Sequence, residues 1–214
     1  MNTNRNQQVK KNQSLGKPFS LFPFTKVTRG NADNGFSKTI YHQAQLDIEQ
    51  DRLLTNKSLI EIELNQIPDL RNTCKALYNT FFENEAPYTA LQFTSILGNL
   101  KPFSQWDIEK IKKSPEGSHV LVQNELLKVV LIHWHPGKTS NIHGHPAGGG
   151  VFKVLYGSIE EWRYTTNASP KLLATSTYET GSIGYIDDQM GYHSVSNPFG
   201  TSAISLHAYT RGLK

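Results

Sequence analysis

Apolar residues first recur with a clear period between residues 67 and 81. Their spacing of three and four residues places them on one face of a helix. Pro68 suits the first turn, where a missing N–H leaves no intrahelical bond unmade. The members of this face are Ile67, Leu70, Cys74, Leu77, Tyr78 and Phe81. The pattern predicts a helix over this stretch.

Two shorter helices are predicted downstream. The apolar positions between Thr89 and Leu97 fit one helical face, and Gly98 follows as a natural stop. A further helical piece is predicted to open at Pro102 and to run through Ile111. We expect these helices to pack on one side of the domain that follows.

The pattern changes after Pro115. Short runs rich in β-branched and aromatic residues alternate with Gly, Pro, Asn and Asp turn signals. The eight predicted strands are Val120–Val122, Leu127–Trp134, Gly150–Tyr156, Ile159–Thr165, Lys171–Thr177, Ile183–Ile186, His193–Val195 and Ser202–Tyr209. Short strands at regular spacing indicate a mainly β sandwich or jelly-roll barrel rather than an alternating βα fold.

The N-terminal part of the chain differs in composition. Residues 1–17 are rich in Asn, Gln and Lys and contain almost nothing apolar, which predicts disorder. The aromatic stretch Phe19–Phe24 is expected to dock on the main domain or on a partner subunit, and residues 40–54 suit a helix or an irregular wrap. The predicted divisions are a basic, partly disordered extension over residues 1–60 and one domain over 61–214, with helices at 65–112 and the barrel at 118–210.

The formal net charge of +4 belongs to this extension. Between residues 1 and 45, seven Lys or Arg residues face a single acid, Asp33, so acidic residues are in slight excess elsewhere. The predicted domain has neither a basic helix nor basic residues interleaved with stacking aromatics. We therefore predict no nucleic-acid partner.

The composition predicts neither a membrane protein nor a secreted one. No apolar run approaches the length of a membrane span, and the N-terminus lacks the apolar core of a secretory signal. Cys74, the single cysteine, cannot form an internal disulfide and is expected to be a buried small apolar residue. We expect a cytoplasmic protein that is a monomer or a small homo-oligomer.

Three histidines supply the candidate chemistry. His143 and His145 stand one residue apart on an extended segment, so their imidazoles leave the same face, and His193 begins a later strand. A lone pair of this kind is more often structural, but glycines near all three permit tight turns at a barrel mouth. Neutral imidazoles bind Zn, Fe, Ni and Cu, so the residues predict a metal site without choosing among these ions.

The surroundings of these histidines resemble the two cupin motifs. The matching residues are Gly137, His143, His145, His193 and Asn197. Cupins usually place a Glu shortly after the second His, whereas residues 147–150 contain no acid. An all-histidine set leaves about three positions of an octahedral ion open, which suits a substrate that chelates beside dioxygen. In this the chain resembles the thiol dioxygenases, which implies a cupin jelly-roll barrel with Fe(II) held by the three histidines.

The last predicted strand extends the resemblance. Ser205, His207 and Tyr209 alternate onto one face and resemble the Ser-His-Tyr triad of the cysteine dioxygenase family. The resemblance implies that Tyr209, oriented by His207 and Ser205, donates a hydrogen bond to the substrate or to oxygen. Residues 153–157 and 184–193 also look like that family. Inward-facing polar residues need partners in any protein, so a structural role is the alternative.

Two positions depart from the family. The animal enzymes carry a cysteine that joins the triad tyrosine in a thioether, and Gly150 stands there, so no crosslink to Tyr209 can form and the chain looks like the bacterial-type members. The family arginine that grips the substrate carboxylate should fall near residues 117–120 and is absent. Arg163 and His119 are the nearest cationic substitutes.

The resemblance implies a non-haem iron thiol dioxygenase that oxidises a small thiol with O2 to its sulfinic acid. Cysteine, 3-mercaptopropionate and cysteamine fit, as does a protein N-terminal cysteine. One alternative is a cupin isomerase or a dioxygenase acting on carbon, whose activity would survive changes at His207 and Tyr209. The other is a non-enzymatic cupin that binds a small ligand or a partner.

Overall fold

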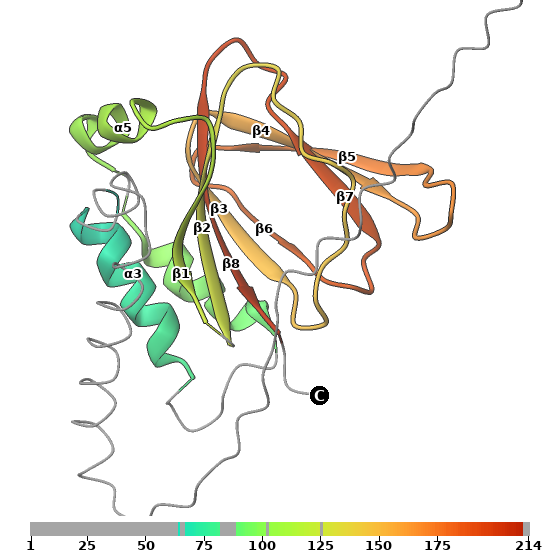
Figure 1. The fold of residues 1–214 in the computed structure, drawn as a ribbon, viewed down its shortest axis with the longest axis horizontal. Helices are drawn as coiled ribbons and strands as arrows, with labels where there is room; N and C mark the ends of the chain where they lie inside the picture. Colours follow the sequence, from blue (N-terminus) through green and yellow to red (C-terminus); the bar gives the residue numbers. More distant parts are fainter. Residues whose placement is uncertain (1–63, 65–66, 82–88, 102, 125, 212–214) are drawn as a thin grey trace, which may run out of the picture.

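The computed structural model describes residues 64, 67–81, 89–101, 103–124 and 126–211 (Figure 1). The predicted N-terminal extension, with its aromatic stretch Phe19–Phe24, lies outside the described residues. The division of the chain at residue 60 therefore stays a prediction.

The first predicted helix is confirmed as α3, Pro68–Asn79. Pro68 occupies its first turn, and the predicted apolar face is buried at Leu70, Cys74 and Leu77. No helix in the described part of the chain has the length and apolar character needed to cross a membrane.

The two shorter helices are present with different limits. The first consists of a 3₁₀ turn, η1 (Ala90–Phe93), followed by α4 (Thr94–Asn99). The helix therefore continues two residues past Leu97, through the expected stop at Gly98. The second, α5 (Gln105–Lys112), begins later than expected. The side chain of Ser104 caps its N-terminus by accepting a hydrogen bond from the Asp107 amide at 3.1 Å.

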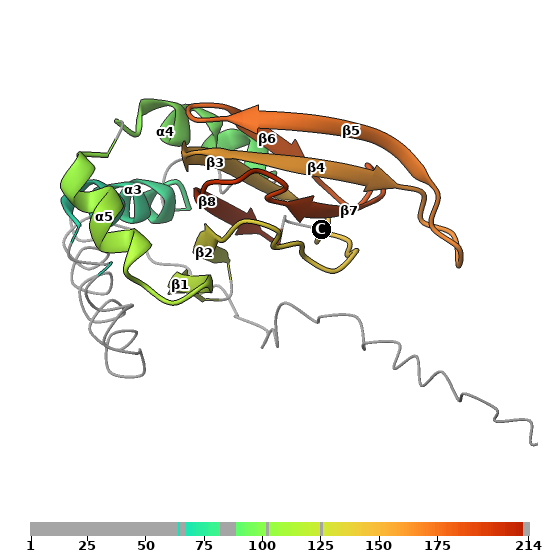
Figure 2. The ribbon, with the colours of Figure 1, turned by 90° about the horizontal axis from the view of Figure 1, so that it is seen from above.

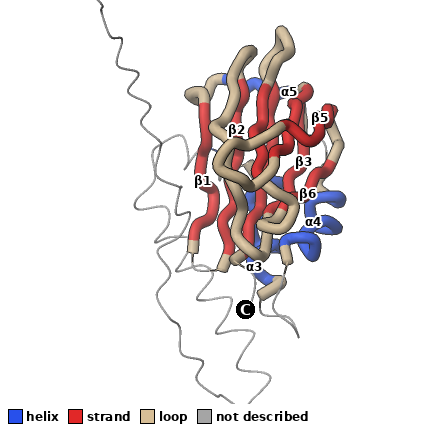
Figure 3. Tube along the Cα trace, turned by 90° about the vertical axis from the view of Figure 1, so that its right-hand side faces the viewer, coloured by secondary structure: helices blue, strands red, loops and turns tan. Residues whose placement is uncertain are grey.

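Eight strands follow in the predicted order. They are β1 (Gly117–Gln123), β2 (Leu127–Trp134), β3 (Gly150–Tyr156), β4 (Ser158–Tyr164), β5 (Leu172–Glu179), β6 (Ile183–Ile186), β7 (Tyr192–Ser196) and β8 (Ala203–Thr210). A five-stranded antiparallel sheet has the order β1-β2-β8-β3-β6, and a three-stranded sheet has the order β5-β4-β7. Figure 3 shows strands of the larger sheet side by side.

Alternating side chains of the larger sheet enter two different cores. On one face, residues such as Leu131 and Leu206 pack with the buried residues of the helices. On the other face, Trp134, Phe152 and Val154 pack with Ile159 and Val195 of the smaller sheet. In Figures 1 and 2 the helices lie beside the larger sheet and strands β4 and β5 form a separate layer. The predicted mainly β jelly-roll barrel with helices packed on it is confirmed.

The long connection between β2 and β3 adds a partner to the smaller sheet. Isolated bridges join Thr139 to Ser196 and His143 to His193, so residues 139–143 run beside β7. The Ser140 amide also donates to the Val195 carbonyl at 2.8 Å. These bonds hold the His143 region against the last strand of the smaller sheet.

The core between the helices and the larger sheet is expected to contribute strongly to the stability of the fold. Phe93 is fully buried, whereas Leu91 on the same 3₁₀ turn is 51% exposed. Phe93→Ala leaves a cavity and is expected to lower the free energy of unfolding by about 3–5 kcal/mol. Leu91→Ala, the matched control, is expected to change it by less than about 0.5 kcal/mol. Urea unfolding followed by tryptophan fluorescence measures both, and similar effects for the two variants would contradict this packing.

Candidate metal centre

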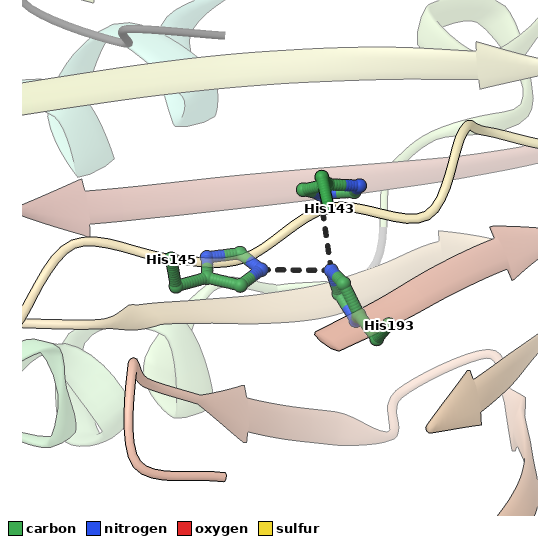
Figure 4. Close-up of side chains that lie close together, drawn as sticks. All are labelled: His143, His145 and His193. Carbon is green, nitrogen blue, oxygen red and sulfur yellow. Dashed lines mark hydrogen bonds between the residues drawn. The ribbon is translucent and has the colours of Figure 1, made fainter. Parts of the chain in front are cut away.

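The structure brings together the three histidines named from the sequence. Ring nitrogens of His143, His145 and His193 all lie within 4.8 Å of one another. The Nε2 atom of His193 is 3.1 Å from that of His143 and 2.7 Å from that of His145. Figure 4 shows the three rings converging, two from the β2–β3 connection and one from β7. Such a set of nitrogens can hold one metal ion.

Backbone pairing positions two of the three rings. The amide of His143 donates to the carbonyl of His193, and the amide of His193 donates to the carbonyl of His143, both at 2.9 Å. This closely paired antiparallel bridge brings together residues that are 50 positions apart. The relative placement of these two histidines is therefore set by the main chain as well as by side-chain rotamers.

Hydrogen bonds on the outer nitrogens leave the inner ones with lone pairs. The Nδ1–H of His143 donates to the Asn141 carbonyl at 2.8 Å, and the Nδ1–H of His193 donates to the Glu161 carboxylate at 2.8 Å. Both acceptors lack a proton to give, so each neutral ring keeps its lone pair on Nε2. Two lone pairs at 3.1 Å repel each other, and a cation between them converts the repulsion into attraction. The donor set thus fits a metal ion bound through Nε2.

His145 completes this set without an outer anchor. Its Nδ1 is buried and has no hydrogen-bond partner among the described residues. Burial, followed by the neighbouring His193 and His143, lowers the pKa of His145 to about 2. Burial, followed by His193, also lowers the pKa of His143. The rings of His143 and His145 are therefore neutral near pH 7, which is the form that binds a metal.

Glu161 anchors the centre from β4 and was not identified from the sequence. Its carboxylate is fully buried and accepts hydrogen bonds from His193 Nδ1 at 2.8 Å, Arg163 Nε at 3.0 Å and Tyr178 Oη at 3.1 Å. Burial raises its pKa, but the hydrogen bond from His193 and the charge of Arg163 outweigh burial, and the pKa of Glu161 is lowered. A carboxylate in this place orients the His193 ring and raises its basicity toward a metal.

The candidate triad lies on the inner face of β8. Ser205 Oγ is 2.7 Å from His207 Nε2, and His207 Nδ1 is 3.1 Å from Tyr209 Oη. The Tyr209 ring stacks on that of His145, with centroids 5.6 Å apart. Burial lowers the pKa of His207 to about 3 and raises the pKa of Tyr209. A neutral phenol therefore stands beside the histidine cluster.

Gly150 lies directly against the ring of Tyr209. A Cβ atom at this position would come within 2.6 Å of Tyr209 Cε1, closer than real side chains approach. Residue 150 thus faces Tyr209, and its glycine leaves room for the ring.

The two cationic substitutes proposed from the sequence lie in different places. Arg163 points into the barrel beside Glu161, and its backbone pairs with that of His193. His119 is not brought to the histidine cluster. It pairs with Leu131, whose side chain packs against the helices, so His119 shares that outer face. Its Nε2 lies 3.0 Å from the Pro115 carbonyl, which gives this buried ring a partner away from the site.

The sequence matches one family over the whole of this region. Residues 100–214 match the family model described as cysteine dioxygenase type I. The matched part contains α5, all eight strands and every residue of the candidate centre.

Several solved structures resemble part of the chain. A Bacillus halodurans protein is 16% identical, covering 54% of this chain and 86% of its own, with a TM-score of 0.43. A Klebsiella pneumoniae protein with a double-stranded β-helix domain is 23% identical, covering 46% and 81%, with a TM-score of 0.36. A cupin-2 domain protein from Shewanella frigidimarina is 12% identical, covering 51% and 96%, with a TM-score of 0.36.

The converging nitrogens predict metal binding that depends on each ring. The full chain, stripped of metal and reloaded with Fe(II) without oxygen, is expected to hold close to one ion. His143→Ala removes one ligand and is expected to weaken binding by at least about tenfold. His135→Ala is the control, because the His135 ring lies against that of His133, outside the cluster. Elemental analysis after dialysis measures the ion, and equal retention by His143→Ala and the unaltered protein would contradict this site.

Proposed function

Because the chain belongs to the cysteine dioxygenase type I family, we propose that it is an Fe(II)-dependent thiol dioxygenase. Family membership and the three-histidine cluster make it a cupin-type metalloenzyme. The proposed reaction joins a small thiol and O2, and both oxygen atoms pass to sulfur to give a sulfinic acid. The observation that carries the proposal is the stacking of Tyr209, the end of the Ser-His-Tyr chain, on the ring of His145.

Each part of the centre has a role in this reaction. A ferrous ion held by His143, His145 and His193 would supply adjacent open positions for thiolate and O2, and would lower the pKa of the thiol. Burial keeps the Tyr209 phenol protonated, so its O–H can donate a hydrogen bond toward the reacting atoms. His207 holds the Tyr209 oxygen from behind at 3.1 Å. Ser205 in turn holds the His207 ring at 2.7 Å.

Arg163 supports a substrate that carries a carboxylate. Its Nε donates to Glu161 and one Nη to the Tyr185 carbonyl at 2.8 Å. The other Nη donates to the sulfur of Met190 at 3.9 Å, and thioether sulfur is a weak acceptor. The Arg163 side chain is 21% exposed, so solvent reaches it. A carboxylate that replaced the Met190 sulfur would gain a charge-assisted hydrogen bond, which favours cysteine or 3-mercaptopropionate over cysteamine.

The reaction is tested by oxygen consumption with each of the three thiols and by mass spectrometry of the product made under ¹⁸O2. We expect a sulfinate with two labelled oxygens. Tyr209→Phe removes the phenolic donor and is expected to lower kcat at least about tenfold, the equivalent of one strong hydrogen bond.

Tyr156→Phe serves as the control for loss of a hydroxyl, because Tyr156 packs with the helix-side core. Failure of every thiol to support turnover in the iron-loaded protein would overturn the proposal. Turnover that survives both Tyr209→Phe and His207→Ala would favour an isomerase or a carbon dioxygenase.

The role of Arg163 makes a separate prediction about substrate preference. Arg163→Gln is expected to raise KM for carboxylated thiols by roughly tenfold or more, because it removes a charge-assisted hydrogen bond. Cysteamine has no carboxylate and is the internal control, so its KM should stay within about twofold. Equal losses with all thiols would show that Arg163 acts only by neutralising Glu161.

A further inference from the structure

A fourth residue joins the Ser-His-Tyr chain from the neighbouring strand. Trp134 ends β2 with its ring in the barrel core, where it is 5% exposed. Its Nε1–H donates to Ser205 Oγ at 2.8 Å, and this bond is buried. The sequence predicted a strand through Trp134 but did not predict this contact, because it depends on the register of β2 against β8.

The indole N–H of Trp134 determines which atom donates in each hydrogen bond of the Ser-His-Tyr triad. Trp134 can only donate, so Ser205 Oγ accepts from it. Ser205 is fully buried, and its own hydroxyl hydrogen needs an acceptor. Among the described residues that acceptor is His207 Nε2, at 2.7 Å. A hydroxyl that accepts a hydrogen bond also donates more strongly, which favours this arrangement further.

The same order of donor and acceptor continues through the His207 ring to Tyr209. A neutral imidazole whose Nε2 accepts carries its proton on Nδ1. That Nδ1–H donates to Tyr209 Oη at 3.1 Å, which leaves the phenolic hydrogen free to point away from His207. The Tyr209 ring stacks on that of His145, so the phenol lies beside the histidine cluster. In the opposite direction Tyr209 would donate to His207 and present only lone pairs to an anionic substrate.

We propose that Trp134 is a positioning residue that fixes the donor-to-acceptor direction of the hydrogen bonds from Ser205 through His207 to Tyr209. The direction of these hydrogen bonds is a property of the folded protein, and its consequence for catalysis rests on the proposed function. Without the indole N–H the Ser205 hydroxyl rotates freely. The reverse chain, with the proton on His207 Nε2, then becomes comparable in energy.

The tautomer of His207 reports the direction without any metal. Nitrogen NMR of the full, metal-free chain with ¹⁵N-labelled histidine distinguishes a protonated Nδ1 from a protonated Nε2, and His207→Gln assigns the signals. We expect Nδ1–H in the unaltered protein and a substantial Nε2–H population in Trp134→Phe. Trp162→Phe is the matched control and should leave the tautomer unchanged, because Trp162 Nε1 donates to Glu160 at 3.2 Å, outside the triad.

Two results would overturn the proposal. One is an Nε2–H tautomer in the unaltered protein, which needs no variant to fold. The other is an unchanged tautomer in folded Trp134→Phe. In the iron-loaded enzyme, kcat of Trp134→Phe is expected to fall several-fold while KM stays within about twofold, since one positioning hydrogen bond is lost. If no thiol is oxidised, the NMR result still decides the direction of the chain independently of the reaction.

Discussion

The backbone bridge between His143 and His193 is the contact on which the rest of the centre depends. The connection between β2 and β3 joins the smaller sheet through this bridge and the one at Thr139. Two hydrogen bonds of 2.9 Å between backbone amides and carbonyls fix the main chain at the point where both imidazoles leave it. Because the bridge joins residues 50 positions apart, the centre exists only when the barrel has closed. The outer hydrogen bonds to Asn141 and Glu161 then turn both Nε2 lone pairs to the same point.

Neighbouring groups stabilise the buried negative charge of Glu161 inside the barrel. A buried carboxylate with no partners would be protonated, but the hydrogen bond from His193 and the charge of Arg163 keep the pKa of Glu161 low. Arg163 carries the compensating charge, so the pair is close to neutral. A divalent ion would add positive charge at the cluster, which an anionic thiolate substrate could offset. The same carboxylate thus serves the ligand geometry and the electrostatics of the proposed substrate.

The period of the strands explains what could be predicted from the sequence and what could not. Alternation placed Ser205, His207 and Tyr209 on one face of β8, which the structure shows, because parity within a strand needs no knowledge of its neighbours. The places of Glu161, Trp134 and His119 relative to the site depend on the register between strands, which alternation within one strand does not give. His119 was expected near the substrate, yet its pairing with Leu131 turns it toward the helices. Glu161 could have been suspected from its place two residues before Arg163 on the same strand.

Gly150 changes how the orientation of Tyr209 is maintained. A thioether would hold the phenol covalently, whereas here the ring is held by stacking on His145, by close approach to Gly150 and by its hydrogen bond with His207. Stacking and close packing fix the plane of the ring but not the direction in which its hydroxyl hydrogen points. That direction follows from the donors and acceptors behind it, and the chain begins at the only member that cannot accept, the indole of Trp134. A centre without the crosslink therefore relies on the polarity of its hydrogen bonds, which ties the Tyr209 hydroxyl on β8 to a residue of β2.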